Sequence, residues 1–119
     1  MLLRRSMHEL SLCRTVLDII NDHVSGTDYK QVKKITLDIG QLAAVDQAAL
    51  RFSFDVVTKG TLAEHALLEI IEIEGMAFCD FCQKTVKLKR YDDACPSCGH
   101  FSLTVTQGEE LRVKCMEVE

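Results

Sequence analysis

The residues best placed for chemistry are four cysteines in two Cys-x-x-Cys pairs, Cys79 with Cys82 and Cys95 with Cys98. Each pair directs two thiolates to one point, so two pairs joined by a hairpin can form a tetrahedral four-sulfur site. Zn²⁺ has no geometric preference of its own and accepts this arrangement. The spacing therefore predicts a structural zinc site that holds a small four-cysteine ribbon together.

Disulfides and iron are the alternative chemistries for these thiols. Disulfides persist in oxidising compartments, whereas the first residues of the chain do not resemble an export signal. Six cysteines without such a signal indicate a reducing cytoplasm, so we expect a cytoplasmic protein. The run from Cys95 to Gly99 also resembles a rubredoxin knuckle, which would hold iron for electron transfer. Neither pair opens a helix after a core strand, which disfavours a thiol–disulfide catalyst.

Composition restricts the partners. The chain has 119 residues, enough for one domain that carries a small module. Its net charge of −4 disfavours nucleic acid as a partner, and its apolar runs are too short to cross a membrane. Four basic residues nevertheless lie between the cysteine pairs: Lys84, Lys87, Lys89 and Arg90. A zinc ribbon that binds nucleic acid or another protein therefore stays open as an alternative function.

A second candidate site lies near the N-terminus. Ser6 and Glu9 fit a capping box, which predicts a helix that starts near Met7. The first amides of a helix lack partners, and His8 adds an imidazole beside them. Nitrogen and carboxylate donors in one plane suit Ni²⁺ or Cu²⁺ better than Zn²⁺. In the plain alternative, which the residues alone favour, Glu9 caps the helix and His8 is solvated.

Hydrophobic periodicity predicts two helices. An apolar stripe with helical spacing runs through residues 7–24, and Gly26 supplies a stop. Asp46 is a good N-cap for a second helix that Gly60 ends. The predicted buried positions of this helix are Ala49, Leu50, Ser53, Phe54 and Val57, widened by Phe52 and Val56.

Period-two alternation predicts the strands. Residues 31–40 read as a half-buried strand, with Ile35, Leu37 and Ile39 inward and Lys34, Thr36 and Asp38 outward. Residues 66–74 and 110–118 read as strands that flank the cysteine segment, and we expect these two to pair with each other. The predicted fold is α+β, a small three-stranded sheet with two helices carrying an inserted four-cysteine zinc ribbon. Its expected domains are 1–75 with 107–119, and the ribbon at 76–106.

Several motifs together resemble one family, the HypA/HybF hydrogenase maturation factors. They are Met7-His8-Glu9-Leu10-Ser11, Asp38-Ile39-Gly40-Gln41-Leu42, Leu68-Glu69-Ile70, the two cysteine pairs, and Gly108-Glu109-Glu110-Leu111-Arg112-Val113. The resemblance runs from Met7 to the C-terminus in the family's order. It implies a nickel metallochaperone, not an enzyme, that helps to insert Ni²⁺ into the large subunit of [NiFe] hydrogenase. Such proteins work with a HypB-type GTPase, and in some organisms they also serve urease.

The resemblance also implies nickel ligands. His8 matches the family's nickel-binding histidine through its side chain and backbone nitrogen, and the nitrogen of Glu9 is a further ligand. Asp46 lies where some members supply a carboxylate, although it has an equal claim to be only a helix cap. His100 follows the second pair and more often packs on such a ribbon than joins a metal. The family begins at the methionine that corresponds to Met7, and the sequence leaves open which methionine starts translation and whether the chain forms a homodimer.

Overall fold

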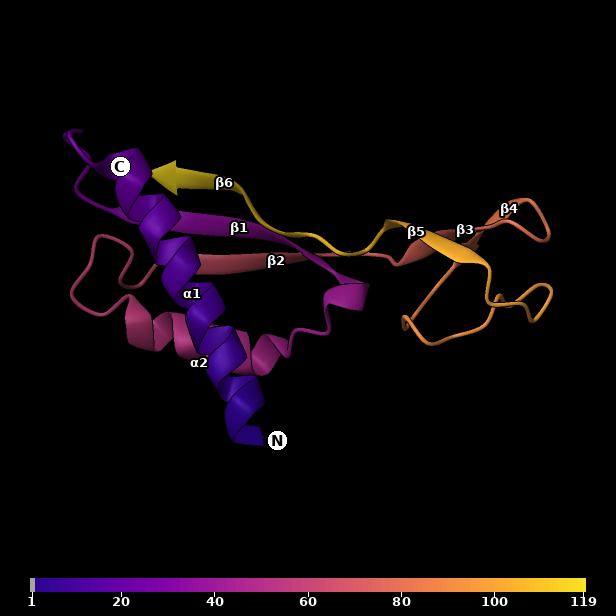
Figure 1. The fold of residues 1–119 in the computed structure, drawn as a ribbon. Coiled ribbons are helices and arrows are strands. Elements are labelled where there is room, and N and C mark those ends of the chain that lie inside the picture. The colour runs from indigo at the N-terminus through magenta and orange to yellow at the C-terminus, as the bar shows by residue number, and fades with distance from the viewer. Residues whose placement is uncertain (1) are drawn as a thin grey trace. The chain divides into compact units, whose positions relative to one another are not determined.

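The structure is a computed structural model that describes residues 2–119, with side chains from His8 onward. Its elements, in chain order, are α1 (Leu2–Val24), β1 (Val32–Gly40), the 3-10 helix η1 (Gln41–Ala43), α2 (Gln47–Val57), β2 (Leu67–Ile73), β3 (Met76–Cys79), β4 (Lys84–Lys87), β5 (Leu103–Gln107) and β6 (Leu111–Val118) (Figure 1). No helix in this described part is both long and apolar enough to span a bilayer. The predicted α+β class is confirmed, as two helices, a small three-stranded sheet and a cysteine-bearing ribbon are all present.

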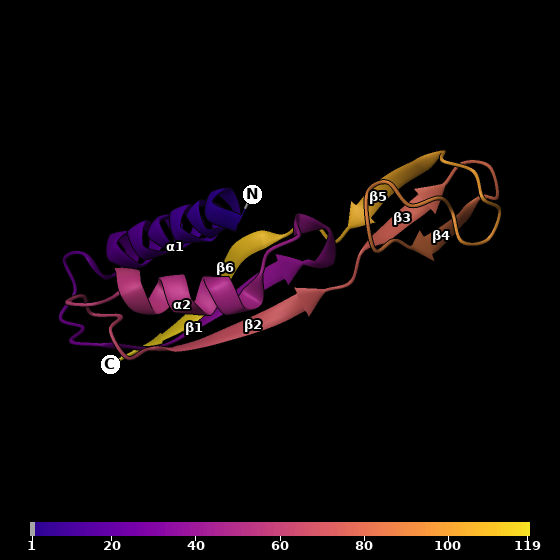
Figure 2. The same cartoon turned by 90° about the horizontal axis from the view of Figure 1, so that it is seen from below.

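The larger sheet has the strand order β2-β1-β6. β1 and β2 run in the same direction, and both helices lie on one side of the sheet (Figure 2). A parallel pair needs a crossover, which α2 supplies. β6 is antiparallel to β1, since the Lys30 N–H donates to the Glu119 carbonyl and the Gly40 N–H to the Glu110 carbonyl, each at 2.7 Å. The predicted pairing of β2 with β6 is wrong, because the β1–α2–β2 crossover places β1 between them.

The helices pack through the predicted stripe of α1. Cys13, Val16, Ile20 and Val24 are buried there, and α2 contributes Leu50 and Phe54 to the same core. The start of α1 differs from the prediction. The helix begins at Leu2 and not near Met7, so Ser6 lies inside it and is not at the N-cap position that the capping box requires.

From Ile35 to Gly40, strand β1 is buried on both faces, which corrects the half-buried prediction for this part of the strand. Thr36 and Asp38 are only 3% and 4% exposed. The Thr36 hydroxyl donates to Glu69 Oε1 at 3.2 Å, and Arg112 Nε donates to Asp38 Oδ2 at 2.9 Å. A central strand has neighbours on both edges, and their long side chains cover its polar face. Alternation in sequence gives the face of a residue but not its neighbours, so it could not show this burial.

Two predicted core residues of α2 are exposed. Phe52 is 72% exposed and Val56 is 46% exposed, whereas Leu50, Ser53 and Phe54 are buried as expected. The helix therefore buries a narrower face than its apolar content predicts. Phe52 and Val56 are left on the solvent side.

The ribbon is a second sheet with the order β4-β3-β5. Both neighbours are antiparallel to β3, with Cys79 opposite Lys84 on one side and opposite Leu103 on the other. Close packing divides the chain into two units. Unit 2 comprises Asp38–Ala44 and Ile70–Arg112, and unit 1 is the remainder of the described chain. Unit 2 contains the end of β1 and η1 as well as the cysteine segment, and the predicted domain bounds, with the ribbon at 76–106, stay a prediction.

Three glycines let backbone segments meet inside unit 2. A Cβ on Gly40 would lie 1.9 Å from the carbonyl oxygen of Gly108, and one on Gly75 would lie 2.1 Å from that of Leu88. Next to this junction is an aliphatic cluster made of Leu42, Ala77, Leu88, Leu103 and Val105. η1 therefore joins the base of the ribbon through Leu42.

Candidate metal centre

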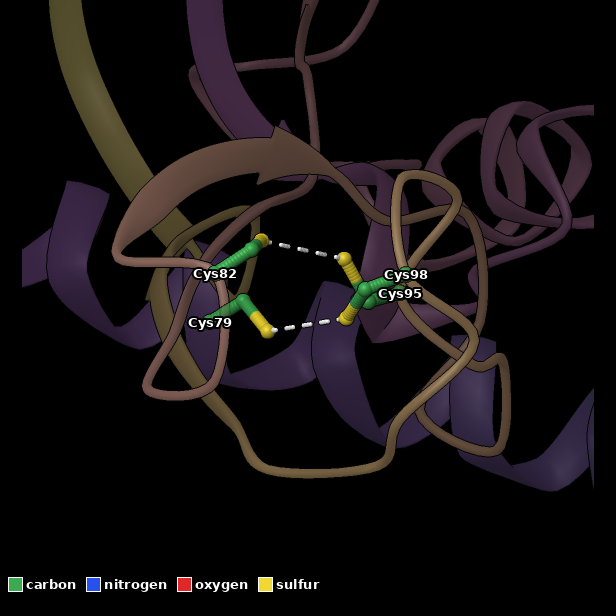
Figure 3. Close-up of side chains that lie close together, drawn as sticks. All are labelled: Cys79, Cys82, Cys95 and Cys98. Atoms are coloured by element: carbon green, nitrogen blue, oxygen red, sulfur yellow. Dashed lines mark hydrogen bonds between the residues drawn. The ribbon is translucent and has the colours of Figure 1, made fainter.

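The four sulfur atoms of the predicted zinc site converge. All lie within 4.8 Å of one another, with Cys79 Sγ 3.6 Å from Cys98 Sγ and Cys82 Sγ 3.8 Å from Cys95 Sγ (Figure 3). Four thiolates about 2.3 Å from a tetrahedral Zn²⁺ would lie about 3.8 Å apart. A disulfide needs a separation of about 2.05 Å, so these sulfurs are not paired covalently. The arrangement fits one tetrahedral metal ion.

Two similar turns present the cysteines. Cys79 ends β3, and the N–H of Gln83 donates to its carbonyl at 2.8 Å. In the second turn the N–H of Gly99 donates to the Cys95 carbonyl at 2.8 Å. Gln83 and Gly99 both have positive φ, 56° and 78°. This backbone costs least for glycine, which explains Gly99 after the second pair.

The pKa values of the thiols differ because backbone N–H groups bond to some of them. Burial alone would raise the pKa of Cys95, but the N–H groups of Ser97 and Cys98 and hydrogen bonds from neighbouring thiols lower it to about 7. Burial and hydrogen bonds to the other three thiols raise the pKa of Cys82 to about 12. Thiolates are the metal ligands, so binding of an ion must displace the remaining protons.

His100 lies outside the sulfur group. Its ring stacks on Phe81 with a centroid distance of 3.6 Å and an interplanar angle of 14°. Its Nδ1 is 3.3 Å from the Cys98 carbonyl oxygen. His100 therefore packs on the ribbon.

The residues of the predicted nickel site do not form a ligand cluster. Over the described side chains, the group of three or more metal-ligating residues is the cysteine group, without His8, Glu9 or Asp46. His8 is exposed, and α1 begins six residues before it. In such a helix the amides of His8 and Glu9 are bonded to carbonyls of the preceding turn. The prediction that the helix starts near Met7, with unpaired amides at His8 and Glu9, is wrong. The role of these residues in nickel binding stays a prediction.

Glu9 and Asp46 occupy different environments. Asp46 is the N-cap of α2, and its Oδ1 accepts the Ala49 N–H at 3.1 Å, as one of its two predicted roles requires. Glu9 is 0% exposed and neither carboxylate oxygen has a hydrogen-bond partner, so it caps nothing. It lies one turn before Cys13 on the buried stripe of α1. Burial, followed by the charge of Glu9, raises the pKa of Cys13 to about 11.

Known proteins resemble most of the chain. The family model for HypA, described as hydrogenase/urease nickel incorporation, metallochaperone, matches residues 7–118. Hydrogenase maturation factor HypA of Legionella pneumophila (strain Lens) is 54% identical over 113 residues, which cover 95% of this chain and 100% of that protein. The protein of the same name from Azotobacter vinelandii is 46% identical with the same coverage.

Solved structures share the fold. The solution structure of the Ni metallochaperone HypA from Helicobacter pylori has a TM-score of 0.65 at 20% identity, covering 92% of this chain and 96% of that one. The solution structure of a HypA protein has a TM-score of 0.67 at 22% identity, covering 95% and 97%. Identities this low establish the fold alone, whereas the sequence relatives establish the family. This chain belongs to the HypA family of hydrogenase/urease nickel-incorporation metallochaperones.

Proposed function

We propose that this protein binds Ni²⁺ reversibly and helps to insert it into [NiFe] hydrogenase, with urease as a further recipient. Family membership over residues 7–118 supports this role. A metal carrier needs no substrate turnover, so we propose no enzymatic activity. The expected partners are a HypB-type GTPase and the hydrogenase large subunit.

We propose Zn²⁺ as the resident ion of Cys79, Cys82, Cys95 and Cys98. The observation that supports it is the set of sulfur separations, 3.6 and 3.8 Å, which match a tetrahedral zinc tetrathiolate. Four protein ligands leave no open position, as in structural zinc sites. Free thiols also need a reducing compartment, which supports the cytoplasm as the location.

The transported Ni²⁺ is expected at the N-terminal part of α1, with His8, Glu9 and Asp46 as its ligands. Imidazole and backbone nitrogens suit a square-planar or tetragonal ion. In α1 the two amides are already used by the helix, so their use as ligands requires the turns before His8 to unwind. A chain that starts at Met7 lacks those turns, and we expect it to bind nickel more tightly than the full chain.

Metal analysis and nickel titration test the two sites separately. The purified protein should contain one Zn²⁺ per chain, and calorimetric titration should show added Ni²⁺ binding without loss of zinc. His8→Ala should abolish nickel binding and leave the zinc content intact. His23→Ala is the matched control, because His23 is also exposed on α1 and its Nδ1 contacts the Ile19 carbonyl at 3.0 Å. Loss of nickel binding in the control, or nickel binding that survives His8→Ala, would refute the assignment.

A further inference from the structure

Strand β4 has an open outer edge. It lies at one end of the ribbon sheet order β4-β3-β5, so β3 covers only its inner side (Figure 2). The Leu88 N–H donates to the Gly75 carbonyl at 2.9 Å, which continues the β3–β4 register by one pair. Successive residues of an antiparallel strand direct their main-chain groups alternately toward and away from the neighbouring strand. The N–H and C=O groups of Thr85 and Lys87 therefore point away from β3, where they are available to an extended chain.

The same edge is strongly basic. Residues 84–90 contain four basic side chains and no acidic one, in a chain whose net charge is −4. Lys87 Nζ lies 3.5 Å from Glu74 Oε2, but these side chains are 74% and 51% exposed, so water screens the ion pair. Three further basic side chains form no salt bridge within the described residues: Lys84, Lys89 and Arg90.

A small pocket lies beside this edge. It has a volume of about 350 Å³ and is lined by Lys87, Lys89, Asp93, Ala94 and Pro96. The acidic residue among them, Asp93, already accepts the Arg90 N–H at its Oδ2, at 3.2 Å. The pocket thus combines two ammonium groups with an apolar wall from Ala94 and Pro96. A carboxylate on a short aliphatic stem, as in glutamate, matches this lining.

We propose that the outer edge of β4 binds an extended acidic segment of a partner protein as an added strand. The main chain of that segment bonds to Thr85 and Lys87, and its carboxylates contact Lys87 and Lys89. Every residue of this surface belongs to unit 2. The inference does not depend on nickel binding.

The lysines decide which strand can be added. Lysine on an edge strand commonly prevents pairing with other sheets. That protection acts against uncharged and basic strands, whereas opposite charges on neighbouring strands attract each other, so an acidic segment is the one selected. A nucleic acid would also neutralise the lysines. It has no peptide main chain to continue the sheet, however, and the net charge of −4 disfavours it.

Fluorescence anisotropy with the zinc-loaded full chain tests the charge. The probe is a labelled peptide of alternating Glu and Thr, about eight residues long as in a typical strand, and a Lys-Thr peptide of the same length is its control. Lys89→Glu should weaken binding of the acidic peptide by about 10-fold, because one attraction becomes a repulsion. Lys59→Glu makes the same charge change in unit 1 and should have no effect. Equal binding of both peptides, equal effects of both variants, or no binding of the acidic peptide at about 1 mM overturns the proposal.

Hydrogen exchange and a proline variant test the added strand. In the wild type, the acidic peptide should protect the amides of Thr85 and Lys87, whereas Leu88, already bonded to Gly75, should not change. Thr85→Pro removes an outward N–H, which an edge strand tolerates, and keeps every lysine. It should retain zinc and bind the peptide about 10-fold more weakly. Unprotected Thr85 and Lys87 amides overturn the proposal. So does unchanged affinity in zinc-loaded Thr85→Pro, or tighter binding of a thymidine oligonucleotide of the same charge.

Discussion

Removal of the metal should unfold the far part of the ribbon and leave its base folded. The far part depends on a sulfur cluster made of Cys79, Val86 and Cys95, against which Cys82, Cys98 and Leu103 pack. Most of its members are the proposed metal ligands themselves. The base depends on the aliphatic cluster that Leu42, Ala77 and Leu88 form, which contains no cysteine.

The magnitudes favour this division. A structural zinc site contributes about 10–16 kcal/mol of apparent binding free energy in isolated peptides. Full burial of a valine or leucine side chain contributes only about 1.5–3 kcal/mol. Without the ion the sulfur cluster retains Val86 and Leu103 as its apolar residues, so the lost stabilisation exceeds what they supply. The aliphatic cluster contains none of the cysteines and shares only Leu103 with the sulfur cluster, and the hydrogen bond from the Leu88 N–H to the Gly75 carbonyl, at 2.9 Å, stays in place.

Amide hydrogen exchange, followed by mass spectrometry before and after chelation, measures the outcome. The amides of Gln83 and Gly99, which close the two cysteine turns, should lose protection. The amides of Leu88 in the ribbon base and Leu50 in α2 should keep theirs. Cys98→Ser should reproduce the pattern without a chelator. Unchanged protection at Gln83 and Gly99 in metal-free protein would refute the reasoning, and so would a loss that reaches Leu50.

Three further predictions concern other parts of the chain. Gly40→Ala should lower the free energy of unfolding by about 3 kcal/mol, measured by thermal unfolding, because the new Cβ would meet the Gly108 backbone. Gly60→Ala should lower it by only about 1 kcal/mol, because Gly60 has open space around it and only its φ of 77° opposes a side chain. Iodoacetamide at pH 8 should modify exposed Cys115 and spare Cys13, since a raised pKa of about 11 leaves Cys13 almost fully protonated; early labelling of Cys13 in a mass spectrum would contradict this. Asp46→Ala should lower the free energy of unfolding by about 1 kcal/mol because it removes the N-cap of α2, whereas Asp46→Asn keeps the cap. If the Asp46 carboxylate is a nickel ligand, both variants should bind nickel more weakly. Unchanged nickel affinity in Asp46→Asn would exclude Asp46 as a ligand.

The parts predictable from sequence are those fixed by local spacing. Two residues between cysteines define a turn whatever surrounds it, so the four-sulfur site follows from Cys79 to Cys98 alone. The stripe of α1 and the cap at Asp46 are local in the same sense, and the structure confirms both. The HypA family resemblance, which rests on motifs spread along the chain, is also confirmed.

Apart from the start of α1 and the exposure of Phe52, the failures concern contacts between distant segments. Alternation gave Thr36 and Asp38 the correct face of β1, but their burial depends on Glu69 and Arg112 from neighbouring strands. Phe52 lies two residues from both Leu50 and Phe54, roughly 160° around the helix from each, so helical spacing itself places it on the solvent side and its apolar type misled the prediction. Glu9 lies one turn before Cys13 on the buried stripe of α1, so helical spacing indicates its position, but acidic residues are rarely buried and its charge argued against the core.

The six cysteines show why residue type alone does not identify a metal ligand. Cys13 is a free thiol, but it faces the core, donates to the Leu50 carbonyl at 3.4 Å and has a raised pKa. Cys13 is therefore neither a thiolate nor accessible to a metal ion. Cys115 is exposed on a strand, and among the described side chains it belongs to no group of three or more metal-ligating residues. Among the described residues, sulfurs converge in a group of three or more at the two Cys-x-x-Cys turns, and at Cys95 the N–H groups of Ser97 and Cys98 favour a thiolate, which supports these four residues as the proposed metal ligands.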